Sequence, residues 1–296
     1  MDVLTIKGLC KSFGDKQVLK GVELSVPKNS IFGFIGKNGA GKTTVMKCIL
    51  GLIPTDAGEI FVSGERVAFG DTPTNRFIGY LPDVPEFYSF MTAREYLSFS
   101  ADLMRMEKDA AAARVDELLE LVGLSGEKHR IKGFSRGMKQ RLGIAVALLS
   151  RPMLLLCDEP TSALDPVGRR EILDLLVKLK NETTVLFSTH ILSDVERICT
   201  DVVFLNDGKI VCLNNEERFI SYPSQFVIQA CHSEGIEQLS TEFGTTERID
   251  SVTAVFDGGE ERMLEAMRFI AEKRIAVRSI ERLEPTLERL FMEVTT

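Results

Sequence analysis

The amino-terminal part of the chain alternates polar and apolar residues and then passes into short runs that are almost wholly apolar. Residues 3–26 alternate on both sides of a turn at Phe13–Lys16, a pattern that predicts strands joined by that turn. Ile31–Ile35 and Met153–Cys157 are nearly continuous apolar runs. Strands buried on both faces of a parallel sheet have this composition. We therefore expect a β-rich beginning followed by central strands of a parallel sheet.

The middle of the chain follows the period of a helix. From about Glu86 to Leu149, apolar residues recur at helical spacing, which predicts a helical insertion. A second helix, over about Val167–Lys180, stands between the strand that ends at Cys157 and another apolar strand, Thr184–Ser188. Strand, helix and strand in this order form a βαβ unit. A hairpin over residues 202–212 is predicted to complete the large unit.

The pattern changes after Asn214, where the apolar runs become shorter. The elements predicted beyond this point are strands at 225–230, 252–256 and 275–280 and a helix around 263–270. We expect residues 215–296 to form a small α+β domain, separate from a large domain over residues 1–214.

Composition and charge limit the classes of function. The 296 residues contain 36 Lys and Arg against 43 Asp and Glu, which gives a net charge of −7. Because an acidic chain has no general attraction to nucleic acid, no nucleic-acid partner is expected. The most apolar stretch, Leu142–Leu149, is far shorter than the ~20 residues of a membrane-spanning helix. The first residues lack the apolar core of a secretory signal, which predicts a cytoplasmic protein.

A glycine-rich loop with the chemistry of a phosphate site follows Ile31–Ile35. Gly36–Thr43 fits G-x-x-x-x-G-K-[ST] and lies between a buried strand and a helical run, the context that this motif requires. Its backbone N–H groups and the helix dipole can hold phosphate, Lys42 can reach the β- and γ-phosphates, and Thr43 can hold Mg²⁺. The residues of this segment predicted to bind ATP are Gly36, Asn38, Gly39, Ala40, Gly41, Lys42, Thr43 and Thr44.

Two adjacent acids end the apolar strand Met153–Cys157. Asp158 is predicted to hold the Mg²⁺ shell opposite Thr43. Glu159, which points the other way on the strand, is predicted to polarise a water molecule in line with the γ-phosphate. Alone, the two carboxylates would be typical of a solvated strand end, but together with the phosphate loop they indicate an ATP-hydrolysing site.

Three further segments resemble motifs of one protein family. They are Phe134–Arg141 before the acidic strand, Ser162–Asp165 after it, and Ser188–His190 at the end of the next apolar strand. They resemble the signature, the D-loop and the switch histidine of the ATP-binding-cassette (ABC) ATPases, and the resemblance extends from about residue 3 to residue 212. It implies an α/β fold, a P-loop NTPase core with an antiparallel β subdomain and a helical subdomain at about 86–149, plus the small C-terminal α+β domain.

The resemblance also implies roles for single residues. Phe13 occupies the position of the aromatic residue that stacks on adenine, His190 that of the histidine beside the γ-phosphate, and Asp165 belongs to the D-loop. In this family the residues at Ser135 and Gly137 contact the γ-phosphate bound to the opposite subunit. Because the chain has one phosphate loop and one signature, it is expected to pair with a second ATP-binding subunit. A homodimer is expected, and a heterodimer stays open.

The chain departs from the family pattern at two positions. Asp83 stands where the family usually has glutamine; it is predicted to contact the nucleotide site through a Mg²⁺-bound water, and the alternative is a turn acid between Pro82 and Pro85. Met138 replaces the last glutamine of the signature. Some exporter-type cassettes resemble this chain at both positions and have a C-terminal extension that ends much like residues 279–294.

The resemblance predicts the ATP-binding subunit of a multisubunit ABC transporter, an exporter, bound to a separate transmembrane permease subunit at the cytoplasmic face of the membrane. The helical insertion would present a groove to that partner. The alternative is a soluble ABC ATPase that acts on the ribosome or on nucleic acid, although such proteins have two cassettes or long coiled coils, which this chain lacks. For the C-terminal domain, a ligand sensor and an accessory dimerisation surface both stay open.

Overall fold

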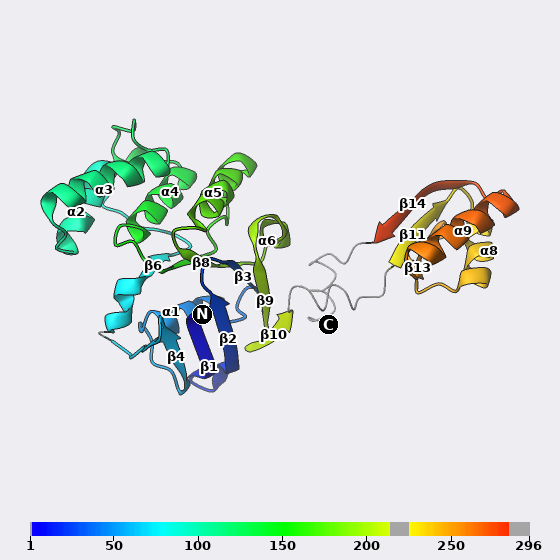
Figure 1. Cartoon of the computed structure of the whole chain (residues 1–296), viewed down its shortest axis with the longest axis horizontal. Helices are drawn as coiled ribbons and strands as arrows, with labels where there is room; N and C mark the ends of the chain where they lie inside the picture. The colour runs from blue at the N-terminus through cyan, green and yellow to red at the C-terminus, as the bar shows by residue number, and fades with distance from the viewer. Residues whose placement is uncertain (1, 71, 214–224, 284–296) are drawn as a thin grey trace. The chain divides into compact units, whose positions relative to one another are not determined.

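The computed structural model describes residues 2–70, 72–213 and 225–283. These residues form two compact units, the first over 2–213 and the second over 225–283 (Figure 1). Each unit has its own buried apolar core. The expected boundary at Asn214 lies outside the described residues, as does the part of the C-terminal extension after Leu283.

The first unit begins with an antiparallel sheet in the strand order β2-β1-β4-β5. Its strands are β1 (Asp2–Phe13), β2 (Lys16–Pro27), β4 (Ala57–Val62) and β5 (Glu65–Arg66). The turn between β1 and β2 includes Gly14, whose φ of 56° lies in the left-handed region that glycine tolerates. Ile6 and Leu24 of this sheet belong to the same apolar core as Phe34. The predicted pair of strands is confirmed, whereas β4 and β5 were not predicted.

A mainly parallel sheet forms the centre of the first unit, in the order β10-β9-β3-β8-β7-β6. Its strands are β3 (Ile31–Ile35), β6 (Ile78–Leu81), β7 (Leu154–Asp158), β8 (Thr184–Thr189), β9 (Asp201–Asn206) and β10 (Lys209–Leu213). Every residue of β3, β7 and β8 is buried, which confirms the predicted parallel sheet. Because β3, β7 and β8 are parallel neighbours, the loops after them meet at one edge.

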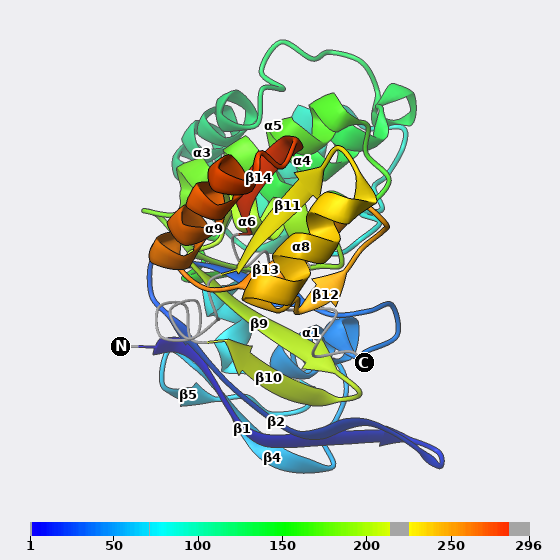
Figure 2. The same ribbon diagram turned by 90° about the vertical axis from the view of Figure 1, so that its right-hand side faces the viewer.

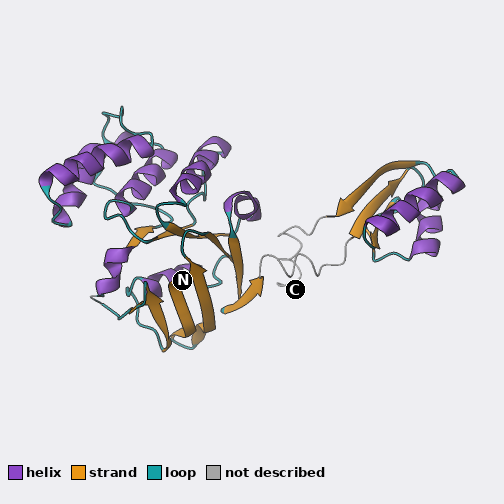
Figure 3. Cartoon of the chain, viewed as in Figure 1, coloured by secondary structure: helices purple, strands orange, loops and turns teal. Residues whose placement is uncertain are grey.

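The helices of the first unit connect these strands. They are α1 (Lys42–Ile49), α2 (Ala93–Leu103), α3 (Lys108–Leu121), α4 (Arg136–Ala147), α5 (Pro166–Leu179) and α6 (Leu192–Ile198), with the short 3₁₀ turns η1 (Pro73–Phe77) and η2 (Ile131–Gly133). The helices α2, α3 and α4 pack together as the predicted helical insertion (Figure 3). Within the described ranges, no helix has the length and apolar character needed to cross a bilayer.

The second unit is a four-stranded antiparallel sheet in the order β12-β13-β11-β14, with two helices on one face (Figure 2). Its elements are β11 (Gln225–Ala230), α8 (Ser233–Phe243), β12 (Glu247–Arg248), β13 (Thr253–Asp257), α9 (Glu260–Lys273) and β14 (Val277–Leu283). This βαββαβ order is that of ferredoxin-like folds. Stacked Phe226 and Phe256 pack with Ile236 of α8 in its core. The helix α8 was not predicted, although Ile236 and Leu239 repeat at helical spacing.

Candidate functional site

The phosphate loop joins β3 to α1, and its glycines are required by its backbone. Gly39 and Gly41 have φ values of 83° and 109°. A Cβ atom on Gly36 would lie 2.7 Å from the carbonyl oxygen of Leu205. The helix α1 begins at Lys42 with no acid in its first turn, so its positive dipole end adjoins the loop. Loop and helix end together have the geometry of an anion site.

Lys42 is buried within this loop. Its Nζ donates a hydrogen bond to the carbonyl oxygen of Gly36 at 2.7 Å, and only 6% of its side chain is exposed. The ammonium group is therefore held at the centre of the loop. The other predicted loop residues are exposed Asn38 and Gly39 and half-buried Ala40 and Thr44.

The hydroxyl of Thr43 meets the acid at the end of β7. Thr43 Oγ1 donates to Asp158 Oδ2 at 2.7 Å, and Ser188 Oγ donates to Asp158 Oδ1 at 2.6 Å. Asp158 is 3% exposed. The hydroxyl and the carboxylate are hard oxygen ligands of the kind that Mg²⁺ takes alongside phosphate oxygens, so this pair fits a magnesium ion. Sequence reasoning missed the contact made by Ser188, although a polar residue that ends an apolar strand was a signal.

Glu159 connects the phosphate loop with the segment after β8. Its Oε1 lies 3.0 Å from Lys42 Nζ, and its Oε2 lies 2.9 Å from His190 Nδ1. Its backbone N–H donates to Ser188 Oγ at 3.0 Å, and its φ of 48° is left-handed, a strained conformation for a residue with a side chain. Within the described residues Oε1 accepts no hydrogen bond, so its contact with Lys42 is an ion pair without hydrogen-bond geometry.

Asp83 makes contacts outside this cluster. Its Oδ1 accepts a hydrogen bond from Ser162 Oγ at 2.5 Å and lies 3.6 Å from a guanidinium nitrogen of Arg136. Burial raises the pKa of Tyr80 to about 12, and the charges of Asp158 and Asp83 contribute to the rise. Asp83 therefore contacts the D-loop and α4. The sequence did not indicate these contacts. Its role beside Mg²⁺ stays a prediction.

The signature and D-loop residues begin two helices. Ser135 is exposed and caps α4, because its Oγ accepts from the backbone N–H of Met138 at 3.2 Å. Gly137 lies in the first turn of α4, where a Cβ atom would have Ser135 Oγ as its nearest neighbour, at 4.0 Å. Asp165 caps α5 by accepting from the backbone N–H of Gly168 at 3.1 Å. Both loops thus end at a helix N-terminus, where anions are favoured.

Phe13 lies at the end of β1, where 52% of it is exposed. The Nζ of Lys11 stands over its ring, 5.3 Å from the ring centroid. No described contact joins Phe13, Ser135 or Gly137 to the cluster around Lys42. The contacts of these three residues with the nucleotide therefore stay predictions.

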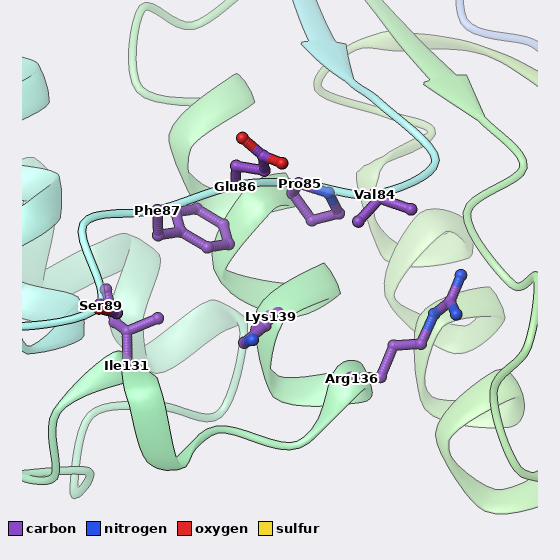
Figure 4. Close-up of a pocket in the computed structure, with 8 residues that line it drawn as sticks. All are labelled: Val84, Pro85, Glu86, Phe87, Ser89, Ile131, Arg136 and Lys139. Carbon is purple, nitrogen blue, oxygen red and sulfur yellow. The ribbon is translucent and has the colours of Figure 1, made fainter.

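Two hollows border the helical insertion. One, of about 800 Å³, lies between η1 and α3 and is lined by Arg76, Met104, Met106, Ala110 and Arg151, among others. The other, of about 490 Å³, lies between residues 84–89 and the start of α4 (Figure 4). Figure 4 shows that the side chains of Glu86 and Phe87, which line this second hollow, point in different directions.

The chain is similar to proteins that are named as ATP-binding proteins of ABC transporters. The family model described as ABC transporter matches residues 19–162. The uncharacterised ABC transporter ATP-binding protein YxlF of Bacillus subtilis (strain 168) is 46% identical over 70% of this chain and 69% of YxlF. The linearmycin resistance ATP-binding protein LnrL of the same strain is 32% identical over 99% of this chain and 98% of LnrL.

A further relative and a solved structure are also similar to this chain. The bacitracin transport ATP-binding protein BcrA of Bacillus licheniformis is 41% identical over 71% of this chain and 68% of BcrA. Among solved structures, cbiO1 from Clostridium perfringens, part of the ABC transporter complex cbiONQ, superimposes with a TM-score of 0.68 at 25% identity. That match covers 81% of this chain and 95% of cbiO1.

Proposed function

Since this chain belongs to the ABC transporter ATP-binding proteins, a family that binds and hydrolyses ATP, we propose that it works as one of two subunits that close on ATP and reopen after hydrolysis. The observation that carries the proposal is the cluster of Lys42, Glu159 and His190 at the carboxyl ends of β3, β7 and β8. Ligands of open α/β sheets bind at this edge.

Three side chains of the cluster would carry the hydrolysis chemistry. Lys42 would place its ammonium group against the β- and γ-phosphates, which compete with Glu159 for that charge. The Glu159 oxygen released in this way accepts no other hydrogen bond among the described residues, so it can take a proton from the attacking water. His190, which is held by the other oxygen of Glu159, would contact the γ-phosphate.

Thr43 and Asp158 are the residues that would hold Mg²⁺. When bound, the ion would neutralise negative charge on the phosphate oxygens. Ser188 fixes the carboxylate of Asp158 from the side away from Thr43, and this contact keeps one oxygen directed toward the phosphate loop.

A second ATP-binding subunit would complete the site. The exposed Ser135 and the half-buried Gly137 have no described contact with the phosphate loop of their own chain. At the N-terminus of α4 they are suited to bind a phosphate that another subunit presents. We therefore expect a homodimer with two ATP molecules between the subunits, and a heterodimer with a related subunit is the alternative.

A transmembrane subunit is the partner that converts closure into transport. The hollow between η1 and α3 is lined by Met104, which is 48% exposed, and by Arg76 and Arg151. Exposed apolar surface with a polar rim is typical of protein interaction sites. This hollow of the helical insertion would receive a cytoplasmic helix of the permease.

Export is the direction of transport that we propose. LnrL is named for resistance and BcrA for transport of bacitracin. Removal of a toxic compound is the transport direction that produces resistance. The chain would then lie at the cytoplasmic face of the membrane, bound to its permease.

Affinity isolation in mild detergent tests the partner. We expect the tagged chain to retain a membrane-spanning protein, and Met104→Asp to lose it while its ATP binding is unchanged. Val177→Asp is the control, because Val177 is an exposed apolar residue of α5 outside the hollow. Isolation of ribosomes or nucleic acid in place of a membrane protein would favour the alternative function.

A further inference from the structure

Lys11 is a buried lysine directly behind the exposed ring of Phe13. Only 7% of Lys11 is exposed, although lysine is rarely buried without a partner. Its Nζ stands 5.3 Å from the centroid of the Phe13 ring, within the range of a cation–π contact. The two side chains therefore meet at the end of β1. One face of the exposed ring is therefore covered by a positive charge.

Asp56 fixes the position of that charge. Its Oδ1 lies 3.0 Å from Lys11 Nζ, and its Oδ2 accepts from the backbone N–H of Ser12 at 2.6 Å. Its own N–H donates to the carbonyl oxygen of Cys10 at 3.0 Å. The hydrogen bonds from Lys11 and Ser12 lower the pKa of Asp56, which keeps it ionised. Asp56 thus holds the ammonium group and the backbone on the amino-terminal side of Phe13.

We propose that Lys11 is a positioning residue for nucleotide binding, which holds the ring of Phe13 with one face covered and the other free for the adenine base. The inference rests on the proposed function, which is ATP binding, and on the family resemblance that places Phe13 where an aromatic residue stacks on adenine. A ring held in one orientation loses less freedom when a base stacks on it. Lys11 acts through Phe13 and contacts no part of ATP itself.

A double-mutant cycle with Lys11→Met and Phe13→Leu tests this proposal. Methionine keeps the length of the buried side chain and removes its charge. ATP affinity is measured at equilibrium with magnesium chelated, so that no turnover occurs, and kcat and KM are measured with magnesium. We expect Lys11→Met to weaken ATP binding about threefold, the scale of an exposed cation–π contact, and to leave kcat unchanged. In the Phe13→Leu background it should have no further effect.

Lys7→Met is the matched control. Lys7 lies on the same strand, and its Nζ stands 5.6 Å from the ring centroid of Phe61. The Lys7→Met variant therefore loses the same kind of contact, at a ring to which no nucleotide role is assigned. Its ATP affinity should stay at the wild-type value. Asp56→Asn is the second variant, in case Lys11→Met fails to fold. It keeps the side-chain volume and weakens the hold on Lys11, so a smaller loss of affinity is expected.

The cycle separates this inference from the proposed function. If Phe13→Leu leaves ATP binding unchanged, the assignment of Phe13 to adenine is wrong, and the inference falls with it. If Phe13→Leu weakens binding while Lys11→Met weakens it equally in both backgrounds, Lys11 acts on the fold alone and only the inference is overturned. An effect of Lys11→Met on kcat with KM unchanged would also contradict it.

Discussion

The carboxylate of Glu159 contacts Lys42 through one oxygen and His190 through the other, at 3.0 and 2.9 Å. The cation of the phosphate loop is thus neutralised by the acid that is proposed to activate water. ATP would compete with Glu159 for Lys42, because its phosphates and the Glu159 carboxylate would share one buried ammonium group. Each anion would then bind that group less strongly. Binding of ATP would therefore release an oxygen of Glu159, which can then accept the proton of the attacking water.

Lys42→Ala should abolish tight nucleotide binding. The variant removes a buried charge that would contact two phosphates, and charge-assisted hydrogen bonds of this kind contribute about 1.5–3 kcal/mol. We expect a loss of ATP affinity of roughly tenfold to a hundredfold, measured by calorimetric titration. The exposed Lys47 of the same helix provides the control variant Lys47→Ala, which should bind ATP like the wild type. Retained affinity in Lys42→Ala would contradict the phosphate-loop assignment.

Ser135→Arg should block pairing and leave binding intact. An arginine at this exposed cap would fill the space that the γ-phosphate of a partner subunit needs. Light scattering with ATP should therefore give a monomer, while the affinity of the monomer for ATP is unchanged. Ser125→Arg, in an exposed turn, should still pair. Dimers of Ser135→Arg would show that the signature lies outside the interface.

Asp83 and Arg136 should act as a pair in hydrolysis. Both side chains are nearly half exposed, so their contact at 3.6 Å is expected to contribute under about 1 kcal/mol. We expect Asp83→Asn and Arg136→Gln each to lower kcat about twofold to threefold, with no further loss when combined. The exposed pair Arg94 and Asp116 gives the control cycle, without effect on kcat. Fully additive losses would show that Asp83 acts independently of Arg136.

Removal of residues 215–296 should leave ATP binding intact and weaken pairing. Each unit has a core of its own, so we expect the first unit to fold without the second. We propose that it is an accessory dimerisation surface and expect the dimerisation constant to weaken several-fold, measured by sedimentation at a series of concentrations. Unchanged pairing would leave the second unit without this role.

The parts of the site that the sequence predicted are contiguous motifs at strand ends. The pattern around Lys42 and the pair Asp158 and Glu159 each follow an apolar strand, and parallel strands bring such ends together. Contacts between distant segments could not be predicted in this way. Ser162 and Asp83 are 79 residues apart, and they follow the parallel neighbours β7 and β6, of which β6 was not predicted.

The strands of the fold also separate into those that the sequence predicted and those that it did not. Strands β3, β7 and β8 were predicted because they are buried on both faces and therefore apolar throughout. Strand β4 was missed because its first three residues are exposed and only Ile60 and Val62 are buried. With two buried residues, its pattern is too weak to separate it from a loop.

Glu159→Gln tests the central claim most directly. The amide keeps the size of the side chain but cannot accept the proton of the attacking water, and loss of such a base costs about 10²–10⁴ in rate. We predict that the variant binds ATP, releases almost no phosphate and accumulates as an ATP-bound dimer in light scattering, whereas the exposed Glu182→Gln behaves like the wild type. Phosphate release at the wild-type rate by Glu159→Gln would contradict the account.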